Sequence, residues 1–293
     1  MKSSLRIQVS DIRYRTSVII LQALRFSFLV LFLFACDIVE APFMEVPEDG
    51  GQTSANPQNV LVLDFTGHTC KSCPKAHQAI GRMEELYGSR LVPIAFHLGY
   101  FSKPLLTGKF TTDFRTPEGT LLENYFEFVS FPIGTVQTLD NNLLQPYASW
   151  PSLVAEAIKG DSPVKISITP EYLSGLNAVN PEISIIALDN VPGPLSFSVY
   201  LTEDSIVDWQ KDEDFDPMDI PGYQHNHVFR TSLNGLWGQK VGTNSGFEKG
   251  FTYKGRLSKI LDAKWNIDNC NLIALVYRED TREIVQVVTV KAK

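Results

Sequence analysis

Two cysteines and two histidines lie within ten residues of one another in the stretch GHTCKSCPKAH, residues 67–77. Cys70 and Cys73 follow a run typical of a buried strand, VLVLDF at 60–65. Where such a pair opens a helix, the first thiol meets unpaired backbone N–H groups and the helix dipole, which lower its pKa. The second cysteine, one turn further on, can close a disulfide with the first. The spacing therefore predicts a pair capable of thiol–disulfide exchange.

The same stretch also offers donors to a metal ion. His68, Cys70, Cys73 and His77 are the ligand types that zinc and copper take. Structural zinc sites usually draw their ligands from two separate segments, and four ligands from ten consecutive residues would crowd one helix end. A third possibility is a permanent disulfide in a protein that only binds a partner. We favour exchange, keep the other two as alternatives, and expect no cofactor.

A second pair of histidines occurs in HNH, where His225 and His227 are two residues apart. In an extended strand both imidazoles would lie on one face, as a metal pair requires. No cysteine or carboxylate stands close to them in the sequence. Ordinary strand histidines are therefore the favoured interpretation of this pair.

The elements that must position the dithiol alternate between strand and helix. A second buried run, LVPIAF at 91–96, follows a helix pattern that begins after Cys73 and can end at Gly88. The apolar positions of that helix recur every three or four residues, at Ala76, Ile80, Met83 and Tyr87. A strand, a crossover helix and a strand form a βαβ unit. We expect an α/β domain over residues 58–160.

After Gly160 the pattern changes to short strands with alternating apolar residues, separated by Pro, Gly and Asn. Examples are VKISIT, EISIIAL, LSFSVYL, NLIALVY and IVQVVTV. This pattern predicts an antiparallel, immunoglobulin-like β-sandwich over residues 163–293. Cys270 opens one of the apolar runs, where a buried and unreactive cysteine is expected.

The amino-terminal segment differs in charge from the rest of the chain. Residues 1–35 hold five basic residues and one acidic residue, a net of +4, whereas the whole chain has a net charge of −7. The remainder is therefore near −11, and an acidic body of this kind predicts no nucleic-acid partner. The uncharged run 26–35 is too short to span a bilayer and fits the apolar core of a secretory signal.

The residues LFAC, 33–36, resemble the lipobox of bacterial lipoproteins. The resemblance implies cleavage before Cys36 and attachment of lipid to it, so that the membrane is one expected partner. Residues 36–57 are rich in Pro, Gly and acidic residues and predict a flexible tether. Export would also permit a disulfide between Cys70 and Cys73.

The segment VLVLDFTGHTCKSC resembles thioredoxins around their active site, and the resemblance covers roughly residues 58–160. It implies that Asp64 is the buried carboxylate that moves the proton of the second cysteine. It also implies that Pro132, in SFPIGT, is the cis-proline facing the dithiol. The chain departs from thioredoxins at Thr69, where they carry tryptophan, and in the Lys-Ser pair between the cysteines.

Taken together, the lipobox, TGHTCKSCPKAH, VYLTEDSIVDWQ, YQHNHVFR and REIVQVV resemble the twenty-eight-kilodalton outer membrane protein family of lipoproteins. This resemblance extends over the whole chain. It implies a lipid-anchored protein of the outer membrane. Its expected partners, besides the membrane, are protein thiols or disulfides, or a surface ligand bound by the second domain.

Overall fold

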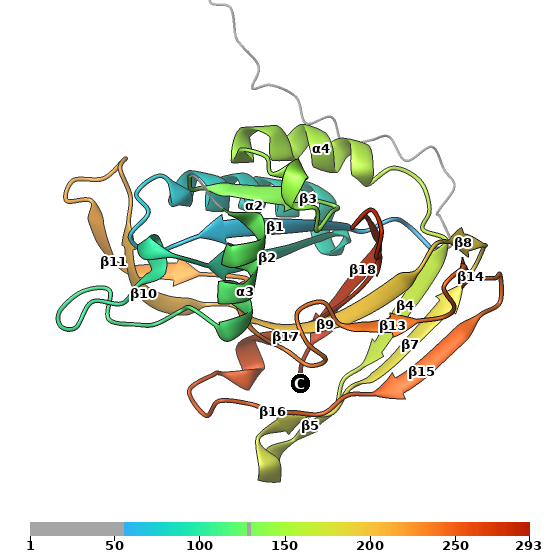
Figure 1. The fold of residues 1–293 in the computed structure, drawn as a ribbon. Helices are drawn as coiled ribbons and strands as arrows, with labels where there is room; N and C mark the ends of the chain where they lie inside the picture. The colour runs from blue at the N-terminus through green and yellow to red at the C-terminus, as the bar shows by residue number, and fades with distance from the viewer. Residues whose placement is uncertain (1–55, 128–129) are drawn as a thin grey trace, which may run out of the picture. The chain divides into compact units, whose positions relative to one another are not determined.

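The computed structural model describes residues 56–127 and 130–293, and Figure 1 shows their arrangement. The predicted signal segment, Cys36 and nearly all of the tether lie outside the described residues. The described part is mostly β-structure in mixed and antiparallel sheets. Its α-helices are α2 (Cys73–Tyr87), α3 (Pro117–Phe126) and α4 (Trp150–Ala157).

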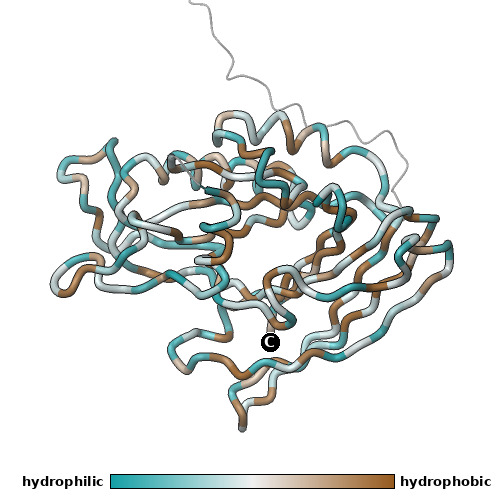
Figure 2. Tube along the Cα trace, in the orientation of Figure 1, coloured by the Kyte–Doolittle hydropathy of each residue, from teal (hydrophilic) through white to brown (hydrophobic). Residues whose placement is uncertain are grey.

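One eight-stranded sheet contains the strands that position the dithiol. In order across the sheet, its strands are β18 (Ile284–Lys291), β17 (Cys270–Arg278), β9 (Leu195–Glu203), β12 (Val228–Ser232), β2 (Leu91–His97), β1 (Val60–Thr66) and β3 (Ile133–Val136), and β13 (Gln239–Val241) also pairs with β9. Figure 2 shows hydrophobic stretches along the central strands. The expected buried strand at 60–65 is confirmed, because every residue of β1 is buried.

Strands β1 and β2 pair in parallel, and helix α2 connects them, as the predicted βαβ unit requires. Helix α2 ends at Gly88, whose φ of 54° places it in the left-handed region that glycine adopts without strain. Alternation along β1 and β2 divides their side chains between two faces. Leu63, Phe65 and Phe96 join one apolar core, so Asp64 and His97 point to the opposite face.

The large sheet contains strands from both sides of residues 160–163, where the sequence predicts a domain boundary. Strand β12, from the second half of the chain, pairs in parallel with β2 through Val228 and Ala95. The backbone N–H of Ala95 also donates to the carbonyl of His227 at 2.8 Å. Main-chain hydrogen bonds between β2 and β12 thus join the two halves of the sequence. The apolar pattern of each single strand does not show that these two strands pair.

A three-stranded antiparallel sheet packs on one face of β9 and β17. Its strands are β15 (Thr252–Arg256), β7 (Glu182–Ala187) and β4 (Val164–Thr169). Residues alternate strictly between buried and exposed along β4, as the predicted pattern requires. The buried side chains of β4 and β7 meet every second residue of β9 and β17 in one apolar cluster. Tyr200 of β9 and Ile273, Leu275 and Tyr277 of β17 belong instead to the core shared with β1 and β2.

The remaining elements are short ribbons and single turns. The paired strands are β10 (Ile206–Lys211) with β11 (Asp219–His225), β8 (Val191–Pro192) with β14 (Gly246–Phe247), and β6 (Ala178–Val179) with β5 (Tyr172–Leu173) and β16 (Lys259–Ile260). The 3₁₀ turns are η2 (Gly88–Arg90), η3 (Tyr100–Ser102), η4 (Asn141–Leu143), η5 (Tyr147–Ser149), η6 (Ser174–Leu176) and η7 (Ile267–Asn269). The β10–β11 ribbon lies near the dithiol and becomes important below.

Gly134, in β3, allows this strand to approach β1 closely. A Cβ atom there would overlap the carbonyl oxygen of Leu63 and lie 2.6 Å from a ring carbon of Trp150. We expect Gly134→Ala to lower the free energy of unfolding by roughly 1–3 kcal/mol or more, because the backbone must shift. Urea unfolding monitored by circular dichroism measures this. Gly175→Ala is the matched control, since nothing lies within 4 Å of its Cβ position, and an equal loss in both variants would contradict the prediction.

Candidate functional site

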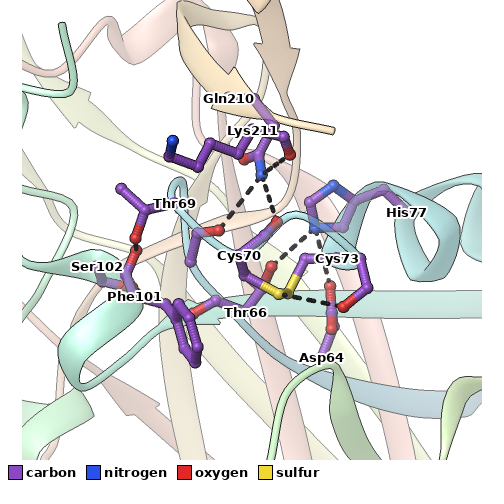
Figure 3. Close-up of a disulfide and its surroundings, with 12 residues drawn as sticks. Asp64, Thr66, Thr69, Cys70, Cys73, His77, Phe101, Ser102, Gln210 and Lys211 are labelled. Atoms are coloured by element: carbon purple, nitrogen blue, oxygen red, sulfur yellow. Dashed lines mark hydrogen bonds and ion pairs between the residues drawn. A yellow bond between two sulfur atoms is a disulfide. The ribbon is translucent and has the colours of Figure 1, made fainter. Parts of the chain in front are cut away.

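Cys70 and Cys73 form a disulfide at the start of α2, with their Cα atoms 5.4 Å apart (Figure 3). The turn that leads into the helix is held by the backbone N–H of Cys70, which donates to the carbonyl of Gly67 at 3.0 Å. Pro74 occupies the first helical turn, where its missing N–H costs no hydrogen bond. Cys70 is 2% exposed and Cys73 fully buried. The expected position of the pair at a strand–turn–helix junction is observed, but its sulfur atoms are shielded.

A hydrogen-bonded chain of side chains lies beside the disulfide. His77 Nε2 is 2.9 Å from Thr66 Oγ1 and 3.3 Å from Asp64 Oδ2, and His77 Nδ1 is 2.7 Å from the hydroxyl of Tyr223. His77 stands one helical turn after Cys73, so both lie on one side of α2. Asp64 is fully buried, and neither of its carboxylate oxygens has a hydrogen-bond partner within the described residues. Asp64 Oδ2 lies at an ion-pair distance from His77 Nε2 instead.

Burial also acts on Tyr223, the outer member of this chain. Loss of solvent, with the nearby carboxylate of Asp64, raises the pKa of its hydroxyl above the ordinary value. Tyr223 therefore remains a neutral hydrogen-bonding partner of His77 throughout the physiological pH range.

Pro132 directly precedes β3, the strand that pairs with β1. The Phe131–Pro132 peptide bond is cis, as the comparison with thioredoxins implied. The Phe131 ring packs edge-on against Phe101, with 5.7 Å between the ring centroids. Phe101 also accepts hydrogen bonds at its carbonyl from the backbone and hydroxyl of Thr69. The contact between Phe101 and Phe131 thus links Thr69, which precedes the first cysteine, to the peptide bond of Pro132.

Strand β10 is bonded directly to the dithiol turn. The Gln210 side-chain amide donates to the carbonyl of Cys70 at 3.0 Å (Figure 3). The backbone N–H of Lys211 donates to the carbonyl of His68 at 2.9 Å. The N–H of Glu213 donates to the carbonyl of Lys71, also at 2.9 Å. We call the Gln210–Glu213 segment the clamp.

Charge pairing reinforces the clamp. Lys75 Nζ is 2.9 Å from Glu213 Oε1, and Lys71 Nζ is 3.5 Å from Glu213 Oε2. These pairs are partly exposed and each adds little stability by itself. Sequence reasoning missed the clamp, because no local pattern shows that residues about 140 positions apart meet.

His68 does not lie beside His77 as one ligand of a shared metal site would. Its imidazole packs against Phe110 and Phe114, and its Nε2 is 3.4 Å from the carbonyl of Lys103. Burial lowers the pKa of His68 below the ordinary value. The sulfurs of Cys70 and Cys73 are bonded to each other. Over residues 56–127 and 130–293, no three or more His, Cys, Asp or Glu side chains are grouped so as to hold a metal ion.

The expectation that His225 and His227 share one face of a strand is wrong. Strand β11 ends at His225, and His227 has a positive φ of 58° that turns the chain before β12. His227 lies within 3.5 Å of carboxylate oxygens of Glu84 and Asp204. His225 is instead buried beside His97. The expectation for Cys270 is confirmed: it is a buried free cysteine, and loss of solvent raises its pKa to about 12.

The family model for outer membrane protein Omp28 matches residues 120–293, more than half of the chain. The chain belongs to the Omp28 family. Its members are outer membrane lipoproteins, so the expected family and location are confirmed. The matched range contains the clamp, Tyr223 and His225, and it begins after the dithiol. No helix in the described part of this Omp28-family chain is long and apolar enough to cross a membrane.

The solved structures that align with this chain have low sequence identity to it. HBP35 of Porphyromonas gingivalis aligns with a TM-score of 0.59 and 15% identity, over 81% of this chain and 76% of that one. A protein of Agrobacterium tumefaciens aligns with a TM-score of 0.51 and 15% identity, over 82% and 97%. A domain of the outer membrane lipoprotein Omp28 from Porphyromonas gingivalis has 21% identity over 44% and 88%, with a TM-score of 0.31. No curated protein matches the chain.

Proposed function

We propose that this Omp28-family lipoprotein exchanges disulfides with protein thiols at the cell envelope through Cys70 and Cys73. Residues 58–160 would act as a thioredoxin-like unit and residues 163–293 as an immunoglobulin-like sandwich, with lipid on Cys36 holding the chain at the membrane. The parallel β1–β2 pair, α2 and the cis bond at Pro132 support the thioredoxin-like assignment.

The observation that carries the proposal is the buried carboxylate of Asp64. A buried carboxylate without hydrogen bonds costs stability, and such costs are concentrated at functional sites. A disulfide that only tied down a turn would need no such group beside it. Asp64 and His77 lie next to the disulfide in Figure 3, where a proton must be given up or taken when the pair opens or closes.

The exchange can be written with its atoms and electrons balanced. A partner thiolate attacks Cys70 Sγ, so that a Cys70–partner disulfide forms and the Cys70–Cys73 bond breaks. Cys73 leaves as a thiolate and takes a proton supplied through Asp64. A second partner thiolate then attacks the partner's own sulfur and releases Cys70 as a thiolate. The partner dithiol is oxidised and the Cys70–Cys73 pair is reduced by two electrons.

A second candidate function has its own support in the structure. Cys70 is 2% exposed, and three hydrogen bonds from the clamp fix the carbonyls of residues 68, 70 and 71. Both features suit a permanent disulfide in a lipoprotein that binds a surface ligand without turnover. Exchange requires the clamp or its surroundings to move, so that a partner sulfur can reach Cys70.

The reduction potential of the pair distinguishes the two functions. We expect the full chain, equilibrated with glutathione or dithiothreitol, to give a potential between about −270 and −120 mV, the range of working oxidoreductases. A potential below about −300 mV is typical of structural disulfides and would replace the exchange proposal with the binding function. Mass spectrometry after alkylation measures the fraction of the pair that is reduced at each ratio.

A further inference from the structure

A cavity of about 210 Å³ opens between α2, the end of β2 and strand β11. Four of the five histidines of the chain line it: His77, His97, His225 and His227. Asp64 and Glu84 line the same cavity. Histidines from three segments of the chain thus line one cavity, although only His225 and His227 stand close together in the sequence.

Two of these histidines are buried with few polar contacts, His97 at 4% and His225 at 2% exposed. Neither ring nitrogen of His97 has a hydrogen-bond partner within the described residues, and the ring of His225 has only a backbone contact with Trp209. Their ring centroids are 5.6 Å apart. Each buried, unpaired polar group costs about 1–3 kcal/mol, so the pair is expensive unless something occupies the nitrogens. Two buried imidazoles this close together can act as two ligands of one metal ion.

The surroundings of the two imidazoles favour a cation. The ring of Phe114 packs against both, at 4.7 and 4.9 Å between centroids. The carboxylates of Asp64 and Glu84 add negative charge to the same cavity.

The number of ligand atoms at the site decides which metal ion it can bind. Imidazole nitrogen suits zinc, copper, iron and nickel. Zinc takes four ligands, at least three of them from the protein, and residues 56–127 and 130–293 contain no such group of three. Monovalent copper is satisfied by two nitrogens in a line. Two bonds of about 2 Å place the nitrogens about 4 Å apart, which a centroid separation of 5.6 Å allows when one nitrogen of each ring faces the other ring.

We propose that His97 and His225 bind one monovalent copper ion between their imidazole nitrogens, in the cavity beneath α2. Asp64 and Glu84 attract the cation without ligating it, and Phe114 holds the two rings in place. This site uses neither sulfur of the dithiol, so the test of metal binding does not depend on the outcome of the exchange experiments.

Silver(I) is the first probe, because it has the same charge and coordination preference as copper(I) and needs no reductant. The full chain carries Cys36→Ser and Cys270→Ala to remove the thiols outside the disulfide. Calorimetric titration is expected to show one tight equivalent. His97→Phe and His225→Phe should each weaken it on the order of 100-fold or more. His225→Met should retain it, since a thioether is a soft ligand. Copper(I) with ascorbate should give the same ranking.

His227→Gln is the matched control, because His227 lines the same cavity but contacts Glu84 and Asp204. It should leave the affinity within about threefold of the parent chain. Imidazole ¹⁵N spectra of the parent chain give a readout that does not depend on how the variants fold: silver should shift nitrogens of His97 and His225. Unchanged affinity in both phenylalanine variants, or ¹⁵N shifts confined to other histidines, would overturn the proposal.

Discussion

Cys70→Ser is expected to abolish disulfide exchange completely, because it removes the sulfur that a partner thiolate attacks. Cys73→Ser should instead accept one partner and hold it, since the resolving thiol is gone and the mixed disulfide at Cys70 persists. A thiol-reactive peptide disulfide, followed by non-reducing electrophoresis and mass spectrometry, reads both outcomes. Each variant replaces one sulfur atom by an oxygen atom, and the two positions are three residues apart.

Cys270→Ser supplies the control, since Cys270 is a buried free cysteine remote in sequence from the pair. It should leave the rate of exchange unchanged. If Cys70→Ser exchanged as fast as the parent chain, the reaction would not proceed through this dithiol. If neither the parent chain nor Cys73→Ser formed any mixed disulfide, the disulfide would be structural and the binding function would stand.

The second large effect concerns a buried ion pair that joins β12 to β9. Arg230 Nε is 2.8 Å from Glu203 Oε2, and the two side chains are 11% and 6% exposed. Glu203 also accepts from the backbone N–H of Asn266 at 2.9 Å. Arg230→Met should lower the free energy of unfolding by about 3–5 kcal/mol, because it leaves a buried carboxylate without its partner charge. Urea unfolding at pH 7 measures the change.

Two further variants separate charge from packing. Arg230→Met combined with Glu203→Gln should recover a large part of the loss, since no uncompensated charge remains. Arg256→Met removes an exposed pair with Glu171, whose side chains are 55% and 44% exposed, and should cost at most about 1 kcal/mol. Equal losses for Arg230→Met and Arg256→Met would contradict the role assigned to burial.

Elements with a complete local signal could be read from the sequence. The apolar spacing after Cys73 and the glycine at 88 predict a helix, and α2 has those limits. Two continuous apolar runs predict buried strands, and β1 and β2 are buried throughout. The Cys70–Cys73 pair and the free Cys270 also follow from spacing and context. In each case the deciding interactions join residues within about one turn or one strand.

The surroundings of the dithiol could not be read in this way. Gln210 bonds to the carbonyl of Cys70 across 140 residues, and Tyr223 bonds to His77 across 146. The HNH motif even suggested a wrong arrangement, because β11 ends at His225 and the positive φ of His227 turns the chain before β12. Neither a conformation of one residue nor a contact between distant strands leaves a periodic trace in the sequence.

The sequence by itself determined the dithiol and the helix and strands that carry it, because periodicity and spacing act over a few residues, and its resemblance to known lipoproteins indicated the family. Only the tertiary structure decided what faces the dithiol and what His225 meets. Those contacts arise because β12 adds to the edge of β2, which brings the preceding β10–β11 ribbon over the dithiol turn and His225 beside His97. Main-chain hydrogen bonds at a sheet edge depend little on the identity of the side chains. The sequence therefore does not show which strand will pair at that edge.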